Sequence, residues 1–406
     1  MRNILIDFTY YQGGMTFHGG GEYGNVILEE LLKRSEQRNC GIFFLKGKRI
    51  NRILFDKCIE RGWNIHAGCD VRNIPSIIEQ YHYTTIYSAL PYINRWDKVK
   101  FSNKNIRLIG TFHGLRNLEL ADCAKDETEF LHNGTDIVQS GYIYGAKDIG
   151  QRNNSAQIYY DALKAFINGK IIAVSEHTKN SIYYYFPDLQ NADIEVLYSP
   201  AKLISAASCF EDDAILNSFG VISGNYGLIV SAGIWYKNGL RAALAYDSIF
   251  ERNLKFIPKN YRVVIVGVKD KTLFMKRIIH KERFVLLDYV SSETLEIFYR
   301  NTQLFIYPSL NEGFGYPPLE AMKYGTLCAC SVNTSIAEVC KDMVLYFNPL
   351  LVDEIAIRIL ESFSDKIRKE KEELIKQQLP FVQQRQKRDL ERIIEIIAGE
   401  GNDKRN

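Results

Sequence analysis

The sequence predicts an α/β protein of two Rossmann-like, doubly wound domains that face a cleft. The chain has 406 residues, and at roughly 150 residues per domain this length fits two or three domains. Short apolar runs alternate with helical periodicity, which is typical of parallel sheets with helices on both faces. The alternation stops over the irregular stretch Pro200–Val221 and then restarts. We therefore expect an N-terminal domain over residues 1–205, a C-terminal domain over residues 222–380 and a helical tail over residues 381–406.

The N-terminal half contains short apolar runs that predict strands, with helical patterns between several of them. The predicted strands are Asn3–Phe8, Gly41–Leu45, Thr84–Ser88, Ile106–Phe112, Lys170–Val174 and Ile194–Tyr198. Apolar residues at helical spacing predict helices over Glu22–Lys33 and Ala156–Ile167.

The C-terminal half repeats this order. Its predicted strands are Gly227–Ala232, Arg262–Gly267, Phe284–Leu287, Leu304–Tyr307 and Leu327–Cys330. A helix is expected over Asn238–Asn253, and Ser291 or Ser292 is expected to cap another. The charge-rich stretch Val352–Ala398 predicts helix interrupted at Pro380.

The composition excludes several classes of protein. Lys and Arg number 51 against 48 Asp and Glu, and the net charge of +3 argues against a nucleic-acid-binding protein. No apolar run reaches the roughly 18 residues of a membrane span, and no signal-peptide h-region follows Asp7. The eight cysteines form no C-x-x-C pair and show no zinc spacing. We expect a cytoplasmic protein that needs no cofactor and no metal.

The segment Asn311–Met322, which reads N-E-G-F-G-Y-P-P-L-E-A-M, carries the strongest functional signal. It follows a predicted strand and opens a helix, and Gly313 and Gly315 let backbone N–H groups approach a ligand closely. A helix N-terminus favours a phosphate. Glu312 on the loop and Glu320 in the helix are placed to contact different parts of one ligand. The plainer interpretation is a glycine-rich turn with a solvated glutamate.

This segment resembles the signature of the retaining nucleotide-sugar glycosyltransferases of family 4 (group 1), which have the GT-B fold. The resemblance continues through Ser331–Val339 and Leu345–Pro349, with Ala337 where proline is usual. It implies an acceptor-side N-terminal domain, a donor-binding C-terminal domain, and C-terminal helices that pack back on the N-terminal domain.

The resemblance also implies a set of donor-binding residues. By this analogy Glu320 binds the ribose hydroxyls of the nucleotide and Glu312 faces the transferred sugar. The donor-binding residues expected in the C-terminal half are Lys237, Val290, Ser292, Glu312, Gly313, Phe314, Gly315 and Glu320.

A glycine loop, H-G-G-G-E-Y at His18–Tyr23, lies between the first strand and the first helix. Such a loop can cradle phosphates, although a flexible turn explains it equally well. In the family a Gly-Gly loop at this place faces the donor diphosphate, and Gly19 and Gly20 match it best.

His113 directly follows the predicted strand Ile106–Phe112, in the sequence T-F-H-G-L-R. A lone histidine after a strand is commonly structural. The resemblance implies that His113 lies beside the transferred sugar, where we expect a hydrogen bond or a backbone carbonyl contact rather than an obligatory base.

Lys237 lies in the segment Ser231–Asn238, where the family has an arginine and a lysine that clamp the diphosphate. Lys237 matches the lysine, but Ile234 occupies the place of the arginine. One cation instead of two would weaken stabilisation of the leaving group, unless Arg241 or another residue substitutes. A solvated lysine at a helix start is the alternative for Lys237.

Taken together, these residues predict a retaining, hexosyltransferase-type enzyme. It would move a sugar from a nucleoside-diphosphate sugar to a glycan or lipid-linked acceptor hydroxyl, in surface polysaccharide, lipopolysaccharide or capsule biosynthesis. Glu312, His113 and Lys237 are the predicted catalytic residues. Two alternatives stay open: a non-catalytic subunit that binds nucleotide sugar, and a nucleotide-sugar epimerase.

The segment Lys46–Lys57 carries five cations and one anion. Its mixture of basic and apolar residues suits peripheral contact with the inner face of an anionic membrane. A solvated helix face is the other interpretation.

Overall fold

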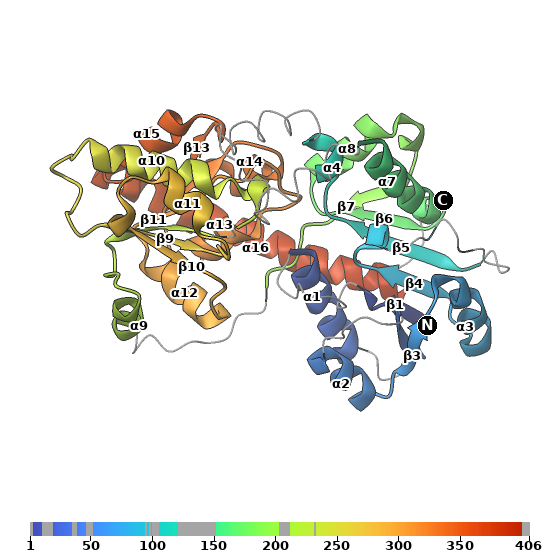
Figure 1. Cartoon of the computed structure of the whole chain (residues 1–406). Helices are drawn as coiled ribbons and strands as arrows, with labels where there is room; N and C mark the ends of the chain where they lie inside the picture. The colour runs from blue at the N-terminus through green and yellow to red at the C-terminus, as the bar shows by residue number, and fades with distance from the viewer. Residues whose placement is uncertain are drawn as a thin grey trace. The chain divides into compact units, whose positions relative to one another are not determined.

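The computed structural model describes residues 3–9, 19–34, 39–45, 52–93, 96, 99, 105–120, 152–202, 212–230 and 233–399. The chain divides into two compact units, drawn in Figure 1. Unit 1 comprises Met1–Leu115, Asn153–Leu203 and Gln383–Asn406, and unit 2 comprises Arg116–Arg152 and Ile204–Val382.

Unit 1 is built on a seven-stranded sheet in the order β3-β2-β1-β4-β5-β6-β7, with every neighbouring pair parallel. The strands are β1 (Ile4–Asp7), β2 (Cys40–Leu45), β3 (Asn64–Cys69), β4 (Thr85–Ser88), β5 (Arg107–Phe112), β6 (Lys170–Ala173) and β7 (Ile194–Val196). All six predicted strands are present. The additional strand, β3, reads N-I-H-A-G-C, and it lies at the sheet edge, where a strand needs no continuous apolar run.

The helices of unit 1 are α1 (Gly19–Lys33), α2 (Arg52–Glu60), α3 (Ile74–Tyr81), α7 (Arg152–Phe166) and α8 (Glu176–Tyr185). Helix α1 starts three residues before its predicted start at Glu22, so the glycine loop forms its first turn. Ser175 caps α8 by accepting a hydrogen bond from the backbone N–H of Thr178, at 3.1 Å.

Unit 2 is built on a six-stranded parallel sheet in the order β10-β9-β8-β11-β12-β13. Its strands are β8 (Tyr226–Ile229), β9 (Arg262–Val266), β10 (Phe284–Leu287), β11 (Leu304–Tyr307), β12 (Cys328–Ser331) and β13 (Leu345–Phe347). Its helices include α4 (Arg116–Glu119), α9 (Asp212–Ser218), α10 (Gly239–Glu251), α11 (Thr272–Arg277), α12 (Ser292–Asn301), α13 (Tyr316–Met322), α14 (Ser335–Cys340) and α15 (Val352–Glu361). The predicted fold class, two parallel-sheet α/β domains, is confirmed.

Two local predictions were wrong. The stretch expected to be irregular contains helix α9. The C-terminal helical stretch breaks between α15 and α16 (Asp365–Ala398), and it continues through Pro380. A proline removes one N–H donor from a helix, and burial of Leu379 and Val382 on either side stabilises the helix across this gap.

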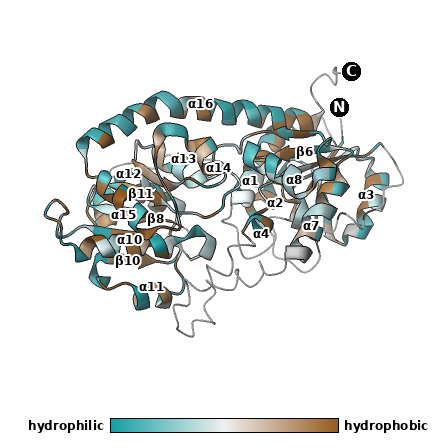
Figure 2. Cartoon of the chain, turned by 90° about the horizontal axis from the view of Figure 1, so that it is seen from above, coloured by the Kyte–Doolittle hydropathy of each residue, from teal (hydrophilic) through white to brown (hydrophobic). Residues whose placement is uncertain are grey.

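The end of α16 packs on the rest of unit 1, as expected. Asp389 accepts a hydrogen bond from the backbone N–H of Tyr198 at 2.9 Å, and Gln386 donates to the carbonyl of Ser199 at 2.7 Å. In Figure 2, α16 is largely hydrophilic with recurring hydrophobic positions. Within the part of the chain that the structure describes, no helix combines the length and the apolar character needed to cross a membrane.

Candidate functional site

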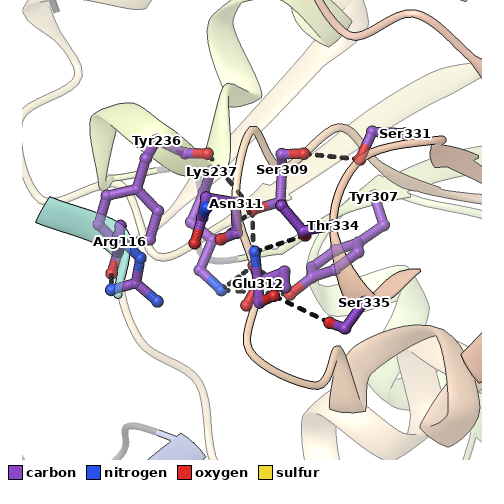
Figure 3. A network of polar contacts seen from close by, with 10 residues as sticks. All are labelled: Arg116, Tyr236, Lys237, Tyr307, Ser309, Asn311, Glu312, Ser331, Thr334 and Ser335. Atoms are coloured by element: carbon purple, nitrogen blue, oxygen red, sulfur yellow. Dashed lines mark hydrogen bonds and ion pairs between the residues drawn. The ribbon is translucent and has the colours of Figure 1, made fainter. Parts of the chain in front are cut away.

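Two loops of unit 2 bring Lys237 and Glu312 together. Lys237 ends a short 3-10 turn after β8, and Glu312 follows β11, which pairs with β8 in the sheet. A backbone hydrogen bond of 2.8 Å from Leu310 to Tyr236 joins the two loops. The Lys237 Nζ atom lies 2.5 Å from Glu312 Oε1, and the two side chains are only 14% and 9% exposed (Figure 3). The sequence placed both residues in the site, and the structure joins them as a largely buried ion pair.

Three donors converge on one oxygen of Glu312. Besides Lys237, the hydroxyls of Tyr307 and Ser309 each donate to Oε1 at 2.6 Å. Burial alone would raise the pKa of Glu312, but the charges of Lys237 and Arg116 and the hydrogen bonds from Lys237 and Ser309 outweigh it and hold the pKa below its ordinary value. Glu312 is therefore a carboxylate at neutral pH. Burial and then the Glu312 charge raise the pKa of Tyr307 well above its usual range, so its hydroxyl stays a donor.

The main chain of Glu312 is also fixed by hydrogen bonds. Its N–H donates to Thr334 Oγ1 at 3.0 Å, and its carbonyl accepts from Ser335 Oγ at 2.9 Å. Thr334 has φ = 56° and ψ = −133°, a strained backbone for a β-branched residue. The S-V-N-T-S segment, recognised in the sequence only as part of a motif, thus fixes the carboxylate loop.

Asn238 fixes the position of Lys237 in the neighbouring loop. It is buried at φ = 57°, and its amide donates to the carbonyls of Pro308 and Pro349 at 3.0 and 2.7 Å. Arg241, named as a substitute for the missing arginine, is buried and donates to Asn238 Oδ1 at 2.9 Å. We therefore assign Arg241 to the support of this loop.

Sequence reasoning assigned no role to Arg116 or Tyr236. Arg116 Nη1 donates to the Tyr236 hydroxyl at 2.8 Å, and its guanidinium carbon lies 3.9 Å from the centre of the Tyr236 ring. One turn further along α4, Glu119 accepts a hydrogen bond from Asn311. Helix α4 therefore contacts both loops of the site, as Figure 3 shows for Arg116.

The rest of the E-G-F-G segment leads into α13. Gly313 and Phe314 are buried, and the Phe314 ring lies 5.4 Å from that of Tyr316. Gly315 precedes α13 with φ = 94°, a conformation that favours glycine, while an added Cβ would meet its nearest atom only at 3.7 Å. Glycine is therefore required here by backbone conformation rather than by space.

Glu320, Val290 and Ser292, which the resemblance places among the donor-binding residues, lie on other elements. Glu320 is half-buried on α13, and after burial its charge is the next cause that raises the pKa of Tyr299. Ser291, rather than Ser292, caps α12, accepting from the N–H of Thr294 at 3.2 Å. Val290 is half-buried and Ser292 is exposed. No hydrogen bond among those described joins Val290 or Ser292 to the Lys237–Glu312 pair.

The predicted residues of unit 1 form a different environment. Gly19 and Gly20 lie in the first turn of α1, and His18 falls outside the described residues. A Cβ added to Gly20 would meet the Leu90 side chain at 2.9 Å. His113 Nε2 lies 3.0 Å from the carbonyl oxygen of Ala89. A carbonyl only accepts, so Nε2 carries the proton.

Of the basic segment Lys46–Lys57, residues 46–51 fall outside the described residues. Within α2, Arg52 pairs with Asp56 at 3.5 Å and Lys57 with Glu29 at 2.8 Å. The described cations of this segment therefore face acidic partners on a solvated helix.

Comparison with known proteins shows a family match within unit 2. Residues 225–379 match the family described as glycosyl transferases group 1. O-antigen chain mannosyltransferase B of Escherichia coli is 46% identical over 79 residues, which cover 20% of this chain and 21% of that protein. O-antigen chain mannosyltransferase RfbU of Salmonella typhimurium is 32% identical over 130 residues, covering 31% and 35%. The matched segments thus span well under two thirds of either relative.

Solved structures extend the likeness in fold to nearly the whole chain. A glycosyltransferase from Rickettsia africae superposes with a TM-score of 0.65 at 15% identity, covering 98% of this chain and 99% of that one. Anabaena HepE, crystallised in complex with UDP, gives a TM-score of 0.66 at 12% identity, covering 98% and 100%. The two-domain fold is thus the GT-B fold, and residues 225–379, which include Lys237 and Glu312, match the glycosyl transferases group 1.

Proposed function

We propose that the protein is a retaining glycosyltransferase that moves mannose from a nucleoside-diphosphate donor to a hydroxyl of a growing lipopolysaccharide O-antigen. The observation that carries the proposal is the buried, ionised Glu312 paired with Lys237 at the E-G-F-G motif of a group 1 domain. The names of the similar O-antigen mannosyltransferases support the choice of sugar and pathway. The complex of HepE with UDP supports a nucleotide donor.

The charges that develop during transfer suit these two residues. As the bond from the sugar carbon to the diphosphate breaks, the sugar becomes oxocarbenium-like, and an ionised Glu312 favours that positive charge. Lys237 stabilises the departing diphosphate. The acceptor oxygen bonds to the same face of the sugar carbon, and the leaving phosphate takes the acceptor proton. Retention follows from attack on the face that the leaving group vacates.

The remaining predicted residues complete the proposal. Gly19 and Gly20 contact the diphosphate through backbone N–H groups, and His113 contacts the sugar. Glu320 binds the ribose hydroxyls. The other donor contacts come from Val290, Ser292, Gly313, Phe314 and Gly315.

Donor identity is tested by thermal unfolding of the full chain with UDP-, GDP-, ADP- and dTDP-sugars. A ligand that binds only the folded state raises its stability, so the donor gives the largest shift. Transfer is then measured from the mannose form of that nucleotide to lipid-linked glycans in a membrane extract, and NMR of the product reports the anomeric configuration. Glu320→Ala should weaken nucleotide binding and Lys237→Ala should slow turnover.

Three outcomes would reject parts of this proposal. Conversion of the donor without any acceptor would indicate the epimerase. Tight donor binding without turnover against any acceptor would indicate the non-catalytic subunit. Wild-type transfer rates in both the Glu320→Ala and Lys237→Ala variants would show that the site lies elsewhere.

A further inference from the structure

The loop after β8 supplies one cation where the resemblance predicts two. Ile234 offers neither charge nor a side-chain donor to an anion. Arg241, the next cation along, is buried against Asn238. After burial, its charge is the next cause that lowers the pKa of Arg277. A diphosphate at Lys237 would therefore need its other cation from a different element.

Arg116 lies where that cation is needed. The Tyr236 ring is shared by two positive groups: the guanidinium carbon of Arg116 is 3.9 Å from its centre and Lys237 Nζ is 5.7 Å from it. Arg116 and Lys237 therefore both lie close to the ring of Tyr236, the residue that immediately precedes Lys237 (Figure 3). The 2.8 Å hydrogen bond to the Tyr236 hydroxyl fixes the orientation of the guanidinium.

The segment that carries Arg116 is anchored. Glu119, three residues on, accepts a hydrogen bond from Asn311, the residue before Glu312. Leu120 is buried in the hydrophobic core of unit 2 together with Trp235, the residue before Tyr236. Arg116 is therefore held by contacts to both loops of the site. It is not a surface arginine that takes up this position by chance.

The charge of Arg116 reaches the centre of the network. After burial and the charge of Lys237, it is the next cause acting on the pKa of Glu312, which it lowers. It also opposes the rise in the pKa of Tyr307 that burial and Glu312 produce. A group that acts electrostatically on Glu312 is close enough to act on a phosphate bound beside Lys237.

We propose that Arg116 and Lys237 together bind the diphosphate of the donor, with Arg116 supplying the second cation that Ile234 does not. The inference rests on the proposed function for the identity of the ligand. A guanidinium is always charged and offers a planar fork of N–H donors that matches phosphate oxygens, so Arg116 can hold the Tyr236 hydroxyl and a phosphate together. Because its orientation is set before the ligand arrives, little entropy is lost on binding.

Calorimetric titration of the full chain with inorganic diphosphate tests this site. The variants are Arg116→Gln and, as a control that removes one positive charge from the same unit, Arg252→Gln at an exposed position of unit 2. Loss of a hydrogen bond between charged groups should lower the affinity of Arg116→Gln about 10-fold. Arg252→Gln should stay within about two-fold of the wild type, because exposed charges act weakly through solvent.

An affinity of Arg116→Gln within two-fold of the wild type would overturn the inference. If Arg116→Gln also melts early, Arg116→Lys decides: retention of more diphosphate affinity than Arg116→Gln supports a charge contact, and equal loss in both overturns it. Wild-type transfer is measured separately. Mannose transfer with diphosphate binding insensitive to Arg116 rejects this inference alone, whereas Arg116-dependent binding without transfer of any sugar supports the anion site and rejects the proposed function.

Discussion

The two units place their predicted site residues in contrasting surroundings. In unit 2, a carboxylate and an ammonium lie in a largely buried network whose hydroxyls and amide have fixed partners. In unit 1, His113 Nε2 lies within hydrogen-bond distance of the Ala89 carbonyl, and the His113 and Tyr23 rings form a T-shaped contact with their centres 4.8 Å apart. The Tyr23 hydroxyl lies 3.2 Å from Thr111 Oγ1. Among the predicted site residues, the buried ion pair thus lies in unit 2, which also contains the region that the group 1 family matches.

This difference predicts that loss of a charge in unit 2 has the largest effect on stability and on sugar transfer. Glu312→Gln keeps the size of the side chain but leaves Lys237 without its anion, and breaking a pair this buried costs about 3 kcal/mol of the free energy of unfolding. Sugar transfer should fall by about 100-fold or more. Chemical denaturation and initial rates measure the two effects.

The pH dependence of the same variant isolates the charge. The folded-state pKa of Glu312 is lowered, so its stabilisation is complete above its unfolded pKa of about 4.3 and is lost as the pH falls through the folded value. The wild type should therefore exceed Glu312→Gln by a constant margin from about pH 6 to 8, and the margin should shrink below about pH 4. A margin that stays constant into acid would show that the carboxylate charge does not stabilise this unit.

The glycines of the two units differ in a second way. Gly315→Ala places a side chain at φ = 94° and should cost about 1 to 2 kcal/mol through backbone strain, although the nearest atom is 3.7 Å away. Gly20→Ala meets the flexible Leu90 side chain at 2.9 Å but gains about 1 kcal/mol of helix propensity in α1, so the two effects nearly cancel. Thermal melting of both variants measures the contrast. Equal losses would mean that Gly20 too is required by its backbone.

The extent to which the sequence predicts the structure also differs from one part of the molecule to another. Most strands were predicted because buried parallel strands are apolar throughout. The two strands that were not predicted, β3 and β13, both lie at a sheet edge, where β3 is largely polar and β13 has only three residues. Lys237 and Glu312 belong to motifs with charged residues at fixed spacing. Tyr307 lay inside a predicted strand, where its role as a donor to Glu312 depends on the loop that returns to it.

Arg116 shows more clearly which contacts the sequence alone does not predict. It follows His113 by three residues, and nothing in the neighbouring sequence shows that its guanidinium contacts Tyr236, 120 positions along the chain. Thr334 is a related case, since its positive φ cannot be read from a polar segment. Contacts between distant segments, unlike periodicity, leave no pattern in a single sequence.

In unit 1, His113→Phe tests the predicted site residue that lies outside the Lys237–Glu312 network. The ring can keep its edge contact with Tyr23, but the N–H donated to the buried Ala89 carbonyl is lost, which should cost about 1 kcal/mol of stability. If His113 contacts the sugar through its ring, transfer falls by about 10-fold while inorganic diphosphate binds as before. Unchanged transfer would confine His113 to a structural role. The Glu312→Gln variant, in which transfer should fall most, serves as the reference for the size of the loss.

The smallest effect should come from returning the missing cation to the loop after β8. Ile234 is half-buried with an ordinary extended backbone (φ = −114°, ψ = 126°), so an arginine fits there without strain. In the Arg116→Gln background, Ile234→Arg should recover about five-fold of the lost diphosphate affinity, because a less anchored guanidinium loses more entropy on binding than Arg116 does.

Ile234→Gln in the same background is the control of similar length. Recovery of affinity by glutamine as large as by arginine would show that the loop does not lack a charge. In the wild-type background Ile234→Arg should change affinity less than two-fold, since two cations already neutralise the diphosphate and a third adds repulsion to Arg116 and Lys237. The order of these effects follows from the comparison between the units: a buried charge without its partner has the largest effect, and a third cation added beside two that already bind the diphosphate contributes little.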